Sequence, residues 1–199
     1  MKKIIKLFCI LIALFLLAGC AAEDVPTKEP SQQGPQLNQQ LSGPLSLGDK
    51  MPELTVTTAE GETLLLSELL QTKKMVVLNF WYADCIWCVR EFPVMEAAYQ
   101  QYREDVEILA LNPFDAAGDI VAFRQEHSLS FPMAGCSRDL VMAFGVSGFP
   151  TSVVIDRNGI VCLIHSGAIT EKFVFDRLFE TFTAEEYSSK IYNSISQIF

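Results

Sequence analysis

The chain has 199 residues and half of them are hydrophobic, so it can form one domain with a real core and short appendages. It carries 24 acidic against 15 basic residues, for a formal net charge of -9. Three of the lysines lie in the first six residues, and without them the charge is -12. Because an acidic surface repels phosphate groups, neither nucleic-acid binding nor a polybasic contact with a membrane surface is expected.

The first segment is typical of an export signal. Residues 1–6 contain three lysines, residues 7–18 are apolar, and a glycine and Cys20 follow. The apolar run is shorter than the roughly 20 residues of a spanning helix, so residues 1–19 are expected to be cleaved, with an uncleaved anchor as the alternative. Residues 17–20 (Leu-Ala-Gly-Cys) resemble the lipobox of bacterial lipoproteins. This implies a lipid on Cys20 and a location on the extracytoplasmic face of the cell membrane.

The composition then divides the chain into a spacer, a domain and a tail. Residues 20–46 are rich in Pro, Gln, Ser and Gly and have few periodic apolar residues, so a flexible tether is expected behind the anchor. An ordered extension is the alternative. A folded domain is predicted over residues 47–183, and the tail at 184–199 has no assignment.

The domain begins with a predicted strand pair and a strand-helix-strand unit. Residues 54–56 and 64–66 lie on either side of a glycine turn and predict two strands ahead of the first parallel strand. Apolar runs at 75–80 and 106–111 predict buried strands, and the spacing of apolar residues over 88–104 predicts a helix between them. This order indicates a parallel pair with a right-handed crossover.

The second half of the domain is predicted to add three helices and a hairpin. The helices are expected at 120–127, 140–144 and 171–182. Residues 151–155 and 160–164 flank an Asn-Gly turn and predict a β-hairpin. The whole pattern predicts an α/β fold with a mixed sheet of four or five strands flanked by helices.

A Cys-x-x-Cys pair, Cys85 and Cys88, directly follows the predicted strand at 75–80, at the start of the predicted helix. The amides and the positive dipole end of a helix N-terminus stabilise a thiolate, which is the nucleophilic form of cysteine. Two intervening residues let the second sulfur attack a mixed disulfide formed by the first. This geometry predicts a redox-active disulfide in which Cys85 attacks and Cys88 resolves.

The same spacing also occurs in half of a zinc site and in inert disulfides of exported proteins, so both are alternatives. A tetrahedral zinc site needs further ligands, but Cys136 and Cys162 are isolated, and His127 and His165 are not spaced as a pair. Redox chemistry without a metal or an organic cofactor is therefore favoured, because the electrons reside on the two sulfurs. Cys136 and Cys162 are expected to be thiols, with a disulfide between them as the alternative.

Several motifs together resemble the TlpA/ResA-like branch of the thioredoxin superfamily, which comprises exported, membrane-tethered proteins that handle disulfides outside the cytoplasm. The motifs are, in chain order, 47–54 (Leu-Gly-Asp-Lys-Met-Pro-Glu-Leu), 77–81 (Val-Leu-Asn-Phe-Trp), 85–93 (Cys-Ile-Trp-Cys-Val-Arg-Glu-Phe-Pro), 146–151 (Val-Ser-Gly-Phe-Pro-Thr) and 153–156 (Val-Val-Ile-Asp). The resemblance covers about two thirds of the chain and implies a thioredoxin fold with an N-terminal strand extension.

The resemblance also implies roles for residues around the cysteines. It implies that the Phe149–Pro150 bond is cis, which leaves the backbone of Phe149 free to pair with an extended substrate; an ordinary trans proline is the alternative, since only about one X-Pro bond in twenty is cis. Glu91 matches a buried carboxylate that tunes the thiols and moves protons, and an exposed glutamate that complements the helix dipole is the alternative. Asn79 stands where general thioredoxins have a buried aspartate, so proton handling is expected to shift to Glu91.

Two positions depart from the family pattern. Asp84 replaces the tryptophan that usually precedes the first cysteine, and the pair Ile86-Trp87 lacks the usual proline. If its carboxylate faces the sulfur, Asp84 disfavours the thiolate of Cys85, raises its pKa and makes the protein more reducing. Trp87 is expected to form an aromatic surface that faces the substrate, with plain packing as the alternative.

These features predict a membrane-anchored, extracytoplasmic thiol-disulfide oxidoreductase that reduces protein disulfides through Cys85 and Cys88. The resemblance implies protein thiols or disulfides as substrates, a membrane electron donor, and a role in cytochrome c maturation or envelope redox homeostasis. One alternative is a peroxiredoxin-like peroxidase, which is disfavoured because Tyr82 stands where peroxiredoxins have Thr or Ser. Another is a non-catalytic binding lipoprotein on a thioredoxin scaffold, which is disfavoured because both cysteines are present.

Overall fold

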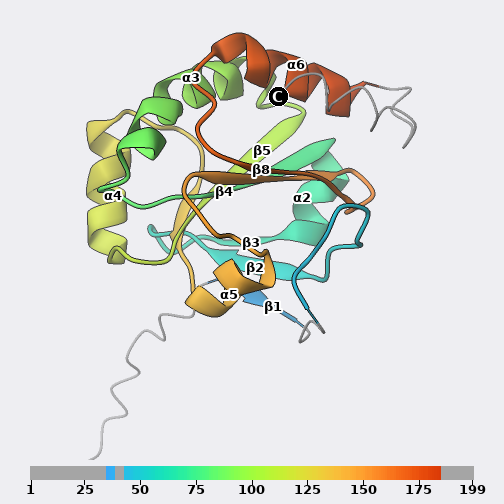
Figure 1. Ribbon diagram of the computed structural model, residues 1–199, viewed down its shortest axis with the longest axis horizontal. Coiled ribbons are helices and arrows are strands. Elements are labelled where there is room, and N and C mark those ends of the chain that lie inside the picture. The colour runs from blue at the N-terminus through green and yellow to red at the C-terminus, as the bar shows by residue number, and fades with distance from the viewer. Residues whose placement is uncertain (1–34, 39–42, 185–199) are drawn as a thin grey trace, which may run out of the picture. The chain divides into compact units, whose positions relative to one another are not determined.

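The computed structural model describes residues 35–38 and 43–184 (Figure 1). All of them belong to one unit, residues 33–199. The predicted signal at 1–19, the lipidation of Cys20 and the tail from residue 185 onward lie outside the described residues. No helix within the described ranges combines the length and the hydropathy of a membrane span.

A five-stranded mixed sheet with the strand order β6-β5-β4-β7-β8 forms the centre of the fold. Its strands are β4 (Met75–Phe80), β5 (Val106–Asn112), β6 (Met133–Gly135), β7 (Thr151–Asp156) and β8 (Val161–Ser166). β5 is parallel to both β4 and β6, whereas β7 is antiparallel to β4 and to β8. All residues of β4, β5 and β7 are buried, and so these strands are runs without apolar-polar alternation. The predicted mixed α/β sheet is confirmed.

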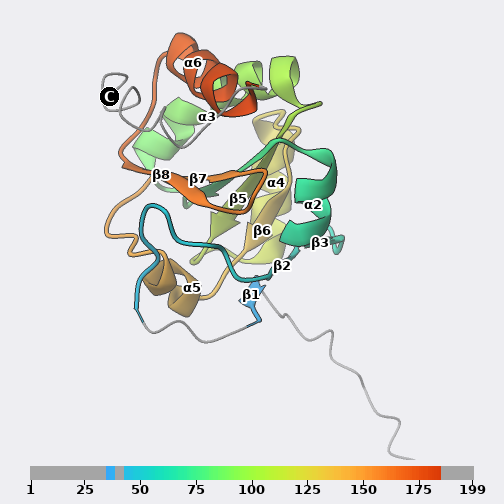
Figure 2. The same cartoon turned by 90° about the vertical axis from the view of Figure 1, so that its right-hand side faces the viewer.

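Helices cover both faces of this sheet. They are α2 (Leu66–Thr72), α3 (Ile86–Tyr102), α4 (Ala117–Glu126), α5 (Arg138–Ala143) and α6 (Lys172–Thr183). One core cluster combines α3, α4 and α6 with the sheet, and the other contains buried residues of α2, α5 and the N-terminal strands. Figures 1 and 2 both show α6 beside α3 on one side of the sheet. This side holds the Cys-x-x-Cys pair.

The predicted N-terminal strand extension is a three-stranded antiparallel sheet with the order β1-β2-β3. Its strands are β1 (Gln36–Leu37), β2 (Leu54–Thr57) and β3 (Thr63–Leu65). β3 ends one residue earlier than predicted, and the next residues form α2, which the sequence reasoning missed.

The flexible tether predicted at 20–46 needs a correction at its end. Leu37 in β1 pairs with Leu54, and Leu45 is buried and donates its backbone N–H to the carbonyl of Ala143 over 2.8 Å. The ordered part therefore begins before residue 47. Backbone pairing with the edge of β2 needs no apolar periodicity, which explains why composition alone indicated a spacer.

The hairpin of β7 and β8 is confirmed together with its turn. Gly159 has φ +72°, a backbone conformation that side chains disfavour. Oδ1 of Asp156 accepts the backbone N–H groups of Asn158 and Ile160, each over 2.9 Å. The turn joins the two strands that form one edge of the central sheet.

Candidate active site

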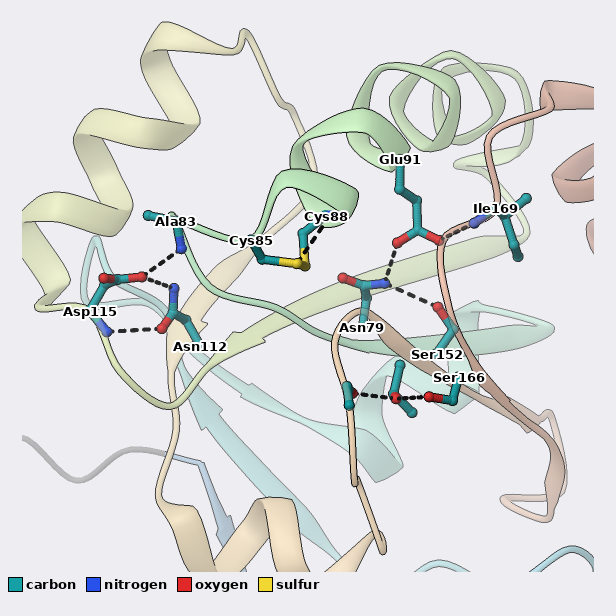
Figure 3. Close-up of a disulfide and its surroundings, with 12 residues drawn as sticks. Asn79, Ala83, Cys85, Cys88, Glu91, Asn112, Asp115, Ser152, Ser166 and Ile169 are labelled. Atoms are coloured by element: carbon teal, nitrogen blue, oxygen red, sulfur yellow. Dashed lines mark hydrogen bonds between the residues drawn. A yellow bond between two sulfur atoms is a disulfide. The ribbon is translucent and has the colours of Figure 1, made fainter.

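Cys85 is the N-cap residue of α3, at the end of the loop that leaves β4. Its Sγ accepts the backbone N–H of Cys88 over 3.2 Å, as Figure 3 shows. Because the first amides of a helix have no partner within the helix and carry its positive dipole end, this position favours a thiolate. The helix begins at Ile86, two residues before the predicted start, and the sulfur lies where the sequence reasoning placed it.

Cys85 and Cys88 form a disulfide (Figure 3). Cys88 is fully buried, whereas Cys85 keeps 5% of its surface exposed. An incoming sulfur therefore reaches Cys85 first, and Cys88 lies behind it in the helix.

Glu91 lies one turn after Cys88 and is completely buried, so the alternative of an exposed glutamate is wrong. Its Oε1 accepts the backbone N–H of Ile169 over 2.9 Å, and its Oε2 accepts Nδ2 of Asn79 over 3.0 Å. Burial raises the pKa of Glu91 to about 7, and the hydrogen bonds from Ile169 and Asn79 oppose part of that rise. The carboxyl group can thus take up or release a proton near neutral pH.

Asn79 connects this carboxylate to the sheet. It is buried in β4, and its Nδ2 also donates to Oγ of Ser152 in β7 over 3.0 Å. Figure 3 shows Glu91, Asn79 and Ser152 as one chain of contacts beside the disulfide. The sequence reasoning named Asn79 and Glu91 separately, and the fold brings them into contact.

The peptide bond between Phe149 and Pro150 is cis, as the family resemblance implied. Thr151, the next residue, starts β7, donates from Oγ1 to the carbonyl of Gly148 over 2.8 Å and pairs with Ser166. The backbone of Phe149 therefore lies just outside the hydrogen-bonded ladder of the sheet.

Two residues that the sequence reasoning missed hold the loop before Cys85. Oδ2 of Asp115 accepts the backbone N–H of Ala83 over 2.8 Å and Nδ2 of Asn112 over 2.7 Å (Figure 3). Oδ1 of Asn112 in turn accepts the backbone N–H of Asp115 over 2.9 Å. An Asn-x-x-Asp sequence directly after a buried strand is a signal of such a turn, but it does not reveal the contact with Ala83.

A cluster of three aromatic rings stands next to this loop. Tyr82 makes edge-to-face contacts with Phe114 and Phe149, at ring-centre distances of 5.5 and 5.4 Å, and Phe114 and Phe149 lie 5.7 Å apart. Of these rings, the sequence indicated a substrate-facing role for Phe149 alone, and Tyr82 entered only as an argument against a peroxidase. Edge-to-face pairs of aromatic rings are stabilising, so these contacts hold the three rings in place relative to one another.

Large apolar side chains are exposed around the cysteines. Ile86, Trp87 and Phe114 are each more than half exposed. Together with Phe149 they are called the apolar rim below. The guanidinium of Arg90 lies 4.8 Å from the centre of the Trp87 ring. Trp87 therefore faces solvent and is not a core residue, which leaves it accessible to a partner.

The residues on either side of the loop before Cys85 differ in burial. Trp81, the last residue of the 77–81 motif, is fully buried against Phe92 and Phe123. Asp84 is exposed on the loop, so its effect on the thiolate stays a prediction.

Cys136 and Cys162 form no disulfide, so that alternative is wrong. Cys136 packs with the core cluster on one face of the sheet and Cys162 with the cluster on the other. Burial raises the pKa of the Cys136 thiol to about 12. Within residues 35–38 and 43–184, no three His, Cys, Asp or Glu side chains are grouped so as to hold a metal ion.

A thioredoxin-like sheet, a Cys-x-x-Cys disulfide at a helix N-terminus and a cis-proline loop define a thiol-disulfide oxidoreductase of the thioredoxin superfamily. Residues 47–164 match the AhpC/TSA family, and the chain belongs to this family. The resemblance to the TlpA/ResA-like branch is likewise confirmed.

The relatives of the chain include oxidoreductases from several bacteria. The thiol-disulfide oxidoreductase ResA of Halalkalibacterium halodurans is 34% identical over 129 residues, which are 64% of this chain and 72% of that protein. ResA of Geobacillus thermodenitrificans is 33% identical over 136 residues, or 67% of this chain and 77% of that protein. The crystal structure of a DsbE-type thiol:disulfide interchange protein from Chlorobium tepidum is similar with a TM-score of 0.62 at 29% identity, and the match covers 70% of this chain and 99% of that one.

Proposed function

We propose that the protein is a lipid-anchored, extracytoplasmic oxidoreductase that reduces the disulfides of protein substrates. The observation that carries this proposal is the position of Cys85. Its sulfur caps α3, accepts the N–H of Cys88 and keeps some exposure, whereas Cys88 is fully buried behind it. A stabilised, accessible thiolate with a buried second thiol one turn away is the arrangement that two-step disulfide exchange requires.

The reaction proceeds in two exchanges. The Cys85 thiolate attacks one sulfur of the substrate disulfide, forms a mixed disulfide and releases the other substrate sulfur as a thiolate. Cys88 then attacks Sγ of Cys85, which breaks the mixed disulfide, frees the second substrate thiol and closes the Cys85–Cys88 disulfide. Two electrons thus pass from the enzyme dithiol to the substrate.

Glu91 supports the second exchange as the proton acceptor. Cys88 is buried and must lose its proton before it attacks, and Glu91 lies one turn further along the same helix. Its pKa of about 7 lies close to neutral pH, where a general base is most effective. The protonated carboxyl group later returns the proton when the disulfide is reduced again.

The substrate binds as an extended segment across the cis-proline loop. The backbone of Phe149 stands just before the first ladder pair of β7, where it can pair with a substrate strand. The apolar rim around Cys85 then contacts side chains of the substrate that flank its cysteine. This arrangement favours protein disulfides with apolar neighbours over small disulfides.

After each turnover the enzyme disulfide needs two electrons from another dithiol. Residues 17–20 resemble a lipobox, and a lipid on Cys20 would hold the domain at the extracytoplasmic face of the membrane. A membrane protein that carries electrons outward is therefore the proposed donor. Cytochrome c maturation or envelope redox homeostasis is the proposed setting, as the resemblance of the sequence motifs to the TlpA/ResA-like branch implies.

The test of the chemistry is a redox equilibrium of the domain with dithiothreitol, read by alkylation and mass, with Cys88→Ser alongside. A potential of about -250 mV or lower, close to the value of about -270 mV for thioredoxin, together with mixed disulfides trapped on Cys85, supports a reductase. Cys136→Ser is the matched control, because this thiol lies on the other face of the sheet and should leave both results unchanged. A strongly oxidising potential would reverse the direction, and the absence of reversible exchange would refute the proposal.

Two further measurements test the alternatives and the anchor. Rapid consumption of hydrogen peroxide by the reduced domain would favour the peroxidase alternative. For the anchor, mass spectrometry of the protein extracted from membranes should show a diacylated N-terminal Cys20. Release of a Cys20→Ser variant into the soluble fraction is expected, and retention of that variant in the membrane would contradict lipid anchoring.

A further inference from the structure

A buried oxygen beside the active-site disulfide has no hydrogen-bond partner. Asn79 is completely buried, and its Nδ2 donates to both Glu91 and Ser152. Its Oδ1 has no donor among the residues that the structure describes. Because most buried polar atoms in folded proteins are hydrogen-bonded, such an acceptor calls for an explanation.

The partners of the amide determine which way this oxygen faces. An ionised Glu91 can only accept hydrogen bonds, so the amide presents its nitrogen to the carboxylate. Figure 3 shows that Oδ1 then lies on the side of the Asn79 amide that faces the disulfide. Cys88 is the fully buried sulfur of that disulfide and belongs to the same core cluster. In the disulfide this sulfur carries no proton, so it has none to donate.

We infer that, in the reduced protein, the Cys88 thiol donates its hydrogen to Oδ1 of Asn79, which makes Asn79 a positioning residue that favours the dithiol over the disulfide. This inference rests on the proposed function. When a dithiol reductant reduces the enzyme, the bond between Cys85 and Cys88 breaks and the reductant becomes a disulfide. Two electrons pass to the enzyme sulfurs. One of the two protons goes to Cys88, where it lies towards Asn79, and the other goes to Cys85 or, while Cys85 is a thiolate, to solvent.

The contact links the redox state to the buried polar chain. In the dithiol form the amide of Asn79 has partners on all sides, namely Cys88, Glu91 and Ser152. In the disulfide form the oxygen loses its donor, and an unsatisfied buried acceptor is unfavourable. The Asn79 amide therefore disfavours the disulfide form. The reduced enzyme is then a weaker reductant than a variant that lacks this amide.

The equilibrium test compares Asn79→Leu with the wild type in dithiothreitol mixtures. Leucine is similar in size to asparagine and has no polar side-chain atom. The measurement is made at about pH 8, above the pKa of about 7 that Glu91 has in the wild type. We expect the variant to favour the disulfide about tenfold more than the wild type does, which corresponds to a potential about 30 mV more negative.

Ser152→Ala is the matched control, since it removes another partner of the same amide and leaves Oδ1 in place. Its equilibrium constant is expected to equal that of the wild type. An unchanged equilibrium constant in Asn79→Leu would overturn the inference. An equal shift in Ser152→Ala would also overturn it, because the effect would then come from the hydrogen-bonded group of Glu91, Asn79 and Ser152 as a whole.

Infrared spectroscopy tests the hydrogen bond directly. In a reduced-minus-oxidised difference spectrum, S–H bands arise only from protonated thiols that change redox state. Cys88 gives such a band, whereas Cys85 gives none while it is a thiolate. The Cys88 band should lie at lower frequency in the wild type and in Ser152→Ala than in Asn79→Leu. If Asn79→Leu does not fold, the wild-type spectrum decides: a spectrum in which every S–H band lies at the frequency of thiols without a strong acceptor would overturn the inference. Failure of the wild type to exchange at all would instead refute the proposed function.

Discussion

Replacing Glu91 with glutamine should remove a large pH dependence from the stability of the domain. The carboxyl group has a pKa of 4.5 when exposed and of about 7 in the folded protein, chiefly because it is buried. The folded state thus holds the proton more tightly than the unfolded state does. The bound proton therefore stabilises the folded protein fully below pH 4.5, and this stabilisation is lost as the pH rises through about 7. At about 1.4 kcal/mol per pH unit, the loss amounts to about 3 kcal/mol. Glutamine has no proton to lose in this range.

Urea titrations of the oxidised wild type and Glu91→Gln at about pH 4.5, 6 and 8 measure this effect. The free energy of unfolding of the variant, relative to the wild type, should rise by about 3 kcal/mol from the lowest to the highest pH. Glu104→Gln is the control, because Glu104 is exposed just beyond the end of α3. A difference between Glu91→Gln and the wild type that does not change with pH would refute the reasoning, since it would mean that Glu91 keeps an ordinary pKa.

Substitutions at three further positions test contacts that the fold creates. Asp115→Ala leaves the N–H of Ala83 without its acceptor and should lower the free energy of unfolding by about 1–2 kcal/mol in urea titrations, whereas Asp115→Asn keeps an oxygen and should lose less. Equal losses would contradict the hydrogen bond. Tyr99→Phe removes the hydroxyl that donates to buried Glu107 over 2.8 Å, and a loss of about 1–3 kcal/mol is expected from the same titrations. Phe114→Ala removes one of the two aromatic rings of the apolar rim that are more than half exposed, and the KM for a peptide disulfide with apolar flanks should rise about tenfold. The KM for a small disulfide is the comparison, and a parallel rise there would argue against substrate contact.

Local patterns in the sequence were sufficient for the centre of the fold and for the two sulfurs. The strands at 75–80 and 106–112 are buried on both faces, so they stand out as short apolar runs bounded by polar residues. The hairpin turn at Gly159 and the helix that starts after Cys85 likewise depend on neighbours within a few residues. The chemistry of Cys85 could be predicted because the capping position is a local property of the chain.

The two short strands that were not predicted lack such local signals. β1 has two residues and β6 has three, and each exists because a longer neighbouring strand offers it backbone hydrogen bonds. Strands that short cannot show apolar alternation. Their pairing depends on where the chain returns in space, so composition assigned β1 to a tether.

The environment of the sulfurs was decided by the tertiary structure. From the sequence, the side chain at position 91 on α3 could be exposed or buried. In the folded chain, Asn79 of β4 and the backbone of Ile169 bind it, and both come from distant segments. Asp115 and Ala83 are likewise 32 residues apart in the chain and meet through one hydrogen bond. The sequence alone determined which atoms exchange electrons, because that chemistry is local to Cys85 and Cys88. Burial, the pKa of Glu91 and the orientation of Asn79 depend on which distant segments pack together, and those contacts exist only in the folded chain.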